Sequence, residues 1–121
     1  MVGVLVDACG WVSLVDAGLN LDSALGDVVG EANLLLIDSV RDELGVLDGE
    51  RRGLLLDLLD MRAESVAAAE VSHTDDTLVS LAVKNSWPVL TIDRRLKERL
   101  IDAGGSYIEV TSGPALRLVR P

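Results

Sequence analysis

The sequence has no phenylalanine, and its aromatic residues together make up only 2% of the 121 residues. Any hydrophobic core must therefore be built from aliphatic side chains. Enough of them are present, because hydrophobic residue types account for 49% of the chain. The length is that of one core of ordinary size, so we expect a single domain over residues 1–121.

Cysteine and histidine occur once each, as Cys9 and His73. One cysteine excludes a disulfide framework and a zinc site built from several thiolates, which fits a reducing compartment. Ser-His-Asp or Cys-His catalysis would depend on His73, for which a surface or capping role is the simpler interpretation. Cys9 is expected to be a small core residue. We expect a cytoplasmic protein.

Long hydrophobic runs are missing as well. The apolar stretch 2–6 has no basic residues before it, and Asp7 interrupts it too early for a signal peptide or a membrane span. We therefore expect no contact with a membrane. The glycine-rich phosphate-binding patterns GxGxxG and GxxxxGK[ST] are absent, as is an Asp-x-Asp phosphatase motif at Asp7.

Positive charge is scarce. Lys and Arg number 11 against 20 Asp and Glu, which gives a formal net charge of −9. This balance argues against an extended basic surface for nucleic acid or anionic lipid, so RNA would have to engage a small area with its own cations. The low lysine content is compatible with adaptation to salt and equally with a GC-rich genome.

Strand-like apolar runs alternate with helical periodicity along the chain. Strands are expected at 2–6, 33–37, 68–71, 88–92 and 107–110, and helices at 8–17, 22–29, 38–47, 50–67, 74–85 and 93–103. This alternation implies right-handed βαβ units and a mainly parallel sheet with helices on both faces. In such α/β folds ligands bind beyond the carboxyl ends of the strands.

Acidic residues stand at these expected positions. Asp7 and Asp93 each follow directly on a strand, Asp75 and Asp76 open a helix, and Glu43 lies one turn into another. An Asp at a helix start is commonly an N-cap, but a carboxylate that ends a buried strand is costly unless it is paired or bound to metal. Carboxylates that converge at one sheet edge favour Mg²⁺ or Mn²⁺ over zinc.

Three segments, VLVDACGWV, VRDELGVL and HTDDTLVSLAVKNSWPVLTIDRRLKERL, resemble the PIN-domain nuclease family in order and spacing over roughly residues 2–111. The chain is most similar to archaeal PIN proteins related to ribosomal-RNA-processing nucleases and, next, to VapC-type toxins. The resemblance implies a Rossmann-like three-layer α/β/α sandwich. It also implies an endoribonuclease that uses Mg²⁺ or Mn²⁺ to cleave single-stranded or structured RNA.

Carried over residue by residue, the resemblance assigns catalysis and metal binding to Asp7, Glu43, Asp76 and Asp93. It prefers Asp76 to its neighbour because the stretch DTLV that begins there matches the family's D-x-L-I spacing, with Asp75 as an additional ligand. Thr91, at the T-x-D position, would orient the acids or a bound water. The bound metal would activate water and stabilise the charge on the scissile phosphate, leaving a 5′-phosphate and a 3′-hydroxyl.

Two arginines are the candidates for RNA binding. Arg94 and Arg95 open a predicted helix, where positive charge opposes the helix dipole, so another purpose is indicated for them. The alternative is a solvated helix face balanced by Glu98.

Rival interpretations remain. Cys9 stands where the family usually has Ser or Asn, which allows a catalytically weak scaffold that binds RNA or protein. A receiver domain would need a second acid beside Asp7 and a lysine directly after a late strand, but Asp7 stands alone and the residues from 111 onward read Thr-Ser-Gly-Pro. Within the nuclease interpretation, an antitoxin protein or ribosome-assembly factors are alternative partners, and a homodimer is expected.

Overall fold

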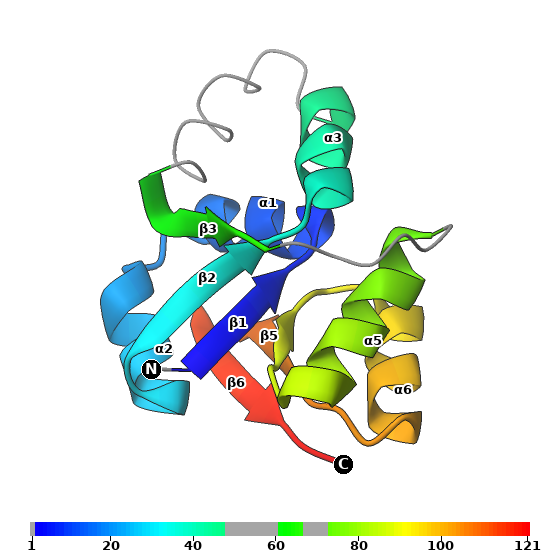
Figure 1. The fold of residues 1–121 in the computed structure, drawn as a ribbon. Helices are drawn as coiled ribbons and strands as arrows, with labels where there is room; N and C mark the ends of the chain where they lie inside the picture. The colour runs from blue at the N-terminus through cyan, green and yellow to red at the C-terminus, as the bar shows by residue number, and fades with distance from the viewer. Residues whose placement is uncertain (1, 48–60, 67–72) are drawn as a thin grey trace.

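The structure is a computed structural model that describes residues 2–47, 61–66 and 73–121. Its strands form one sheet in the order β3-β2-β1-β4-β5-β6, in which only the β5–β6 pair is antiparallel (Figure 1). The strands are β1 (Val2–Val6), β2 (Ala32–Leu36), β3 (Ala63–Ser65), β4 (Val89–Leu90), β5 (Tyr107–Thr111) and β6 (Ala115–Val119).

Helices cover both faces of this sheet and confirm the predicted three-layer α/β/α fold. The described helices are α1 (Ala8–Asp16), α2 (Leu21–Val29), α3 (Asp38–Leu47), α5 (Thr74–Asn85) and α6 (Arg94–Asp102). Helices α5 and α6 pack against each other on one side, α1 and α2 lie on the other, and α3 rises beyond the carboxyl end of β2 (Figure 1). In the part of the chain described, no helix has the length and apolar content needed to span a membrane.

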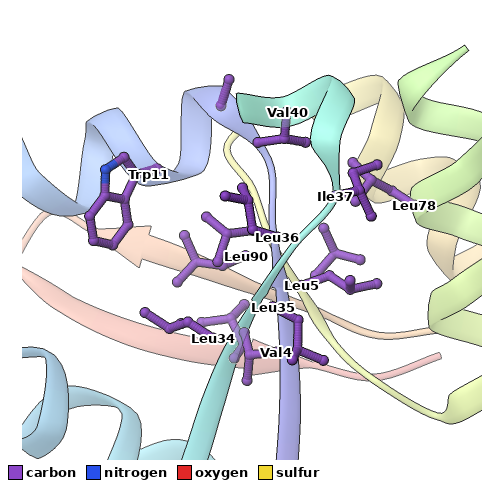
Figure 2. Packing of buried hydrophobic residues seen from close by; sticks show 14 of the residues in the cluster. Val4, Leu5, Trp11, Leu34, Leu35, Leu36, Ile37, Val40, Leu78 and Leu90 are labelled. Atoms are coloured by element: carbon purple, nitrogen blue, oxygen red, sulfur yellow. The ribbon is translucent and has the colours of Figure 1, made fainter. Parts of the chain in front are cut away.

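The core is aliphatic, as the composition predicts, with one large aromatic side chain. Val4, Leu5 and Val6 of β1 are fully buried in succession because helices cover both faces of the central strand. Figure 2 shows Trp11 of α1 beside this cluster and Leu78 of α5 at its other end. A sheet buried on both faces leaves its ligand-accessible surface at the ends of the strands.

The predicted segment between residues 50 and 71 needs correction where the structure describes it. Residues 48–60 and 67–72 lie outside the described residues, and so does the strand expected at 68–71. The helix expected to reach Ala67 has ended by Ala63, where the chain enters β3 and pairs in parallel with β2. Pairing with an open sheet edge overrides the helical propensity of this alanine-containing stretch.

Two further differences concern β4 and the C-terminus. The strand expected at 88–92 is reduced to Val89–Leu90, because the chain leaves the sheet after Thr91, whose backbone N–H still donates to Ile108 of β5. A sixth strand, Ala115–Val119, was not predicted and pairs with β5 as a hairpin. The short β4 matters for function, since it brings the residues of the T-x-D stretch to the sheet edge.

Candidate active site

Asp7, the first residue beyond β1, is buried, with 7% of its surface exposed. Its Oδ1 accepts a 2.6 Å hydrogen bond from the backbone N–H of Gly10, which makes Asp7 the N-cap of α1. Its Oδ2 accepts a 2.5 Å bond from the hydroxyl of Thr91, just beyond β4. Two neighbouring strands thereby hold one carboxylate at their carboxyl ends, and Asp7 forms no ion pair with a described residue.

The environment of Asp7 opposes its ionisation. Burial is the largest influence, and it raises the pKa of Asp7 from 3.8 to about 6. The hydrogen bonds from Thr91 and Gly10 lower this pKa, whereas the charges of Asp75 and Asp93 raise it further. At neutral pH the Asp7 carboxylate is therefore a costly buried charge, which a bound cation would relieve.

Asp93 is linked to Asp7 through Thr91. The backbone N–H of Asp93 donates a 3.1 Å hydrogen bond to the Thr91 hydroxyl oxygen, and that hydroxyl donates to Asp7. The Oδ1 of Asp93 accepts bonds of 2.8 and 3.3 Å from the N–H groups of Arg95 and Leu96, so Asp93 is the N-cap of α6. Asp93 therefore has the capping role expected of an Asp at a helix start, and it is also linked through Thr91 to the buried Asp7.

The two acids at the start of α5 have different surroundings. Asp76 forms an ion pair with Arg99 of α6, with 2.5 Å between Nη2 and Oδ1. Asp75 instead acts through its charge on Asp7 and on Cys9. Asp75 is thus the acid of α5 whose charge acts on Asp7, whereas the D-x-L-I spacing prefers Asp76. The roles of both acids stay predictions.

Helical periodicity places the two acids on different faces of α5 but does not by itself show which face is buried. Asp75 precedes the buried residues Leu78 and Ala82 by three and seven positions, so it shares the face of α5 that packs on the protein. Asp76 stands in the same relation to Val79 and the exposed Val83. The sequence leaves the choice open because apolar residues occupy both series.

The charges of four acidic residues act on the thiol of Cys9. The side chain is exposed, so the expectation of a core cysteine is wrong, because the first turn of α1 opens at the sheet edge. Partial burial raises the pKa of its thiol most, and the charges of Asp7, Asp93, Glu43 and Asp75 raise it further, in that order. Glu43, exposed on α3, therefore lies on the same side of the molecule as the other three acids.

The acids do not form a ready-made metal site. Within residues 2–47, 61–66 and 73–121, no three His, Cys, Asp or Glu side chains are close enough together to hold an ion. The donor chemistry does fit Mg²⁺ or Mn²⁺, since Asp7 is a buried carboxylate influenced by two further carboxylates. Metal binding would require these acids to draw closer to one another.

The cations of α6 fall into two pairs. Lys97 and Arg99 are held by acids of β5 and α5, with N–O distances of 2.9 and 2.5 Å. The Arg94 side chain is 92% exposed and forms a 3.8 Å ion pair with Glu98 one turn further on, as the alternative of a solvated helix face expects, and Arg95 makes no ion pair with a described residue. Arg94 and Arg95 thus remain available to an external anion beside Asp93.

Gly10 brings α1 close to β4 and allows Asp7 to be held there. A Cβ atom at this position would lie 2.2 Å from the backbone oxygen of Leu90 and 2.7 Å from Oδ1 of Asp7. Because a backbone atom cannot move aside cheaply, Gly10→Ala should lower the free energy of unfolding by about 3 kcal/mol despite the better helix propensity of alanine. Urea unfolding followed by circular dichroism measures this loss.

Gly26 is the matched control for that substitution. It also lies in a helix, α2, but a Cβ atom there would meet nothing within 4 Å. Gly26→Ala should therefore leave stability unchanged or raise it by up to about 1 kcal/mol. Equal effects of the two substitutions would contradict the close approach at Gly10.

The fold and this edge define a class of protein: a Rossmann-like α/β domain with carboxylates at the edge where β1 and β4 end and α1, α5 and α6 begin. The chain belongs to the family of PIN-like domains, whose family model matches residues 4–112. The family resemblance of the sequence is thereby confirmed.

Among solved structures, that of the PIN domain endonuclease Utp24 is similar, with a TM-score of 0.84 and 22% sequence identity. The match covers 98% of this chain and 92% of that chain, and at this identity it establishes the fold alone. No curated protein matches the chain.

Proposed function

We propose that the protein is an endoribonuclease that hydrolyses phosphodiester bonds of single-stranded RNA with the help of Mg²⁺ or Mn²⁺. Membership of the PIN-like family supports a nuclease. The single observation that carries the proposal is the buried Asp7, whose pKa is raised to about 6 beside the charges of Asp75 and Asp93. A buried carboxylate with a raised pKa lowers the stability of the folded protein at neutral pH. A role in metal binding would explain why the fold contains it.

Asp7, Asp75 and Asp93 would hold the metal, and Glu43 would bind it directly or through water. Bound there, the metal would supply Lewis-acid stabilisation of the scissile phosphate and lower the pKa of a coordinated water. Thr91 keeps the Asp7 carboxylate oriented through its 2.5 Å hydrogen bond and joins it to the backbone of Asp93. Asp76, held by Arg99, would contribute its charge from the next position of α5.

Arg94 and Arg95 would bind the RNA backbone next to these acids. Both side chains are exposed, and neither contacts the acids that hold Lys97 and Arg99, although Arg94 pairs with the exposed Glu98 at 3.8 Å. A footprint of two arginines and a metal agrees with the net charge of −9, which disfavours an extended contact.

The proposal is tested by cleavage and by thermal unfolding of the unaltered protein. We expect a fluorescent single-stranded RNA to be cut in Mn²⁺ or Mg²⁺ and to stay intact in EDTA. Because a ligand that binds only the folded state stabilises it, Mn²⁺ at about 100 times its Kd should add about 2.7 kcal/mol to the free energy of unfolding. Potassium chloride at the same ionic strength serves as the control.

A scaffold module is the second candidate, favoured by Cys9 at the second position after the first acid and by the absence of a preformed three-ligand cluster among the described residues. It predicts no shift in unfolding temperature at millimolar Mn²⁺ and no cleavage. Two biological settings fit the nuclease: RNA processing with ribosome-assembly factors, and a toxin neutralised by an antitoxin protein. Purification from the native cell, followed by identification of the proteins that copurify, would distinguish these two settings. We further propose that the protein is a homodimer and acts in the cytoplasm.

A further inference from the structure

Ile92, which lies in the chain between Thr91 and Asp93 of the candidate site, exposes a large apolar side chain. Its exposed fraction is 46%, although the three residues before it, Val89, Leu90 and Thr91, are fully buried. The run of buried strand residues therefore ends abruptly between two residues of the candidate site. Placing an isoleucine in water here forfeits the stabilisation that burial of such a side chain provides.

The position of Ile92 is set by hydrogen bonds on both sides of it. Thr91 donates to Asp7 at 2.5 Å and accepts from the backbone N–H of Asp93 at 3.1 Å. Asp93 is held in turn as the N-cap of α6. Because both neighbours are anchored, the backbone of Ile92 is held at a fixed place directly before Asp93, and its exposed side chain is carried there.

The cations that follow complete this surface. Arg94 and Arg95 are exposed at the start of α6, a helix with no acidic residue in its first turn, where positive charge is unfavourable. An exposed apolar side chain followed by two exposed cations matches a nucleotide, which has an apolar base face and an anionic phosphate.

Other exposed apolar side chains lack this setting. Val46 and Met61 lie next to segments outside the described residues, so nothing is inferred from them. Val83 of α5 is 43% exposed but lies two turns beyond the acids at the start of that helix. Single exposed apolar residues are common in proteins, and Ile92 differs from Val83 in its neighbours rather than in its exposure.

We infer that Ile92 packs against the face of one unpaired nucleobase of the substrate while Arg94 and Arg95 hold the adjoining phosphates. This inference rests on the proposed function and extends it to the base contacted beside the scissile bond. A single strand is required, because the base faces of a duplex are already stacked on their neighbours. The contact requires no particular base, since every base has such a face.

The test compares two ligands of equal charge on the full chain in EDTA, where no cleavage occurs. One is an oligouridine of about 12 nucleotides, and the other is the same ribose-phosphate chain without bases. Fluorescence anisotropy at low salt gives the Kd of each. Ile92→Ala should weaken binding of oligouridine about 5-fold and leave binding of the abasic chain unchanged. Ile92→Trp, which offers a larger stacking surface, should tighten binding of oligouridine only.

Two matched variants complete the design. Arg95→Gln should weaken the binding of both ligands to the same extent, since it removes a phosphate contact. Val83→Ala should change neither. The inference is overturned if Ile92→Ala binds oligouridine as the unaltered protein does, or if it loses both ligands equally. Failure of the unaltered protein to bind either ligand in EDTA would overturn this inference, whereas the proposed function is decided separately by cleavage of RNA in Mn²⁺.

Discussion

Asp7→Asn is expected to reduce RNA cleavage by about 1,000-fold or more while making the metal-free protein more stable at neutral pH. The amide cannot supply the negative charge that a metal ion requires. It retains the shape of the carboxylate and an oxygen to accept the N–H of Gly10, so the cap of α1 is kept. Loss of function with a gain of stability is the signature of a residue retained for chemistry.

The direction of the stability change follows from the raised pKa. Between about pH 4 and 6 the folded protein keeps a proton on Asp7 that the unfolded chain has already lost. The free energy of unfolding therefore falls as the pH rises through this window, by about 3 kcal/mol in total at pH values above it. The Asp7→Asn variant lacks this dependence, so its advantage should be absent below about pH 4 and complete above about pH 6.

Urea unfolding in EDTA at a series of pH values measures this difference between variant and parent. Asp38→Asn is the matched control, because Asp38 also begins a helix but is exposed and lies at the start of α3. It should leave both cleavage and the pH dependence nearly unchanged. A stability difference between Asp7→Asn and its parent that does not vary with pH would show that Asp7 titrates normally and is not a costly buried charge.

The sequence predicted those elements whose pattern is set by burial on both sides. The continuous apolar strands β1 and β2 are of this kind. The start of α6 was predicted for a different reason, because an Asp caps the helix there. Strand β3 was missed because three residues at a sheet edge have no periodicity of their own and are selected by the pairing with β2. Strand β6 was missed although Leu116 and Leu118 alternate with exposed residues, since its partner β5 supplies the register.

The candidate site was predictable in its location and less so in its details. Carboxylates that follow β1 and β4 must meet, because these strands are adjacent and parallel. The link from Asp7 through Thr91 to the backbone of Asp93 depends on where β4 ends, which the apolar run 88–92 does not show. The exposure of Cys9 depends on the fact that none of the other described elements covers the first turn of α1 at this side chain, which is a property of tertiary packing.

The choice between Asp75 and Asp76 gives the second large effect. Asp75→Asn should lower cleavage about 100-fold or more and weaken Mn²⁺ binding, because its charge acts on Asp7. Asp76→Asn should change cleavage only a few-fold, since Arg99 already engages that carboxylate.

The two variants control for each other. Both acids lie in the first turn of α5, so each substitution removes a similar interaction with the helix dipole, and the effects on unfolding largely cancel in the comparison. Asp76→Asn additionally loses an ion pair whose side chains are 46% and 38% exposed, worth at most about 1 kcal/mol. Single-turnover cleavage and Mn²⁺ titration in parallel separate chemistry from folding. If Asp76→Asn proves the inactive variant, the D-x-L-I spacing identifies the ligand correctly, and the Arg99 ion pair must open when metal binds.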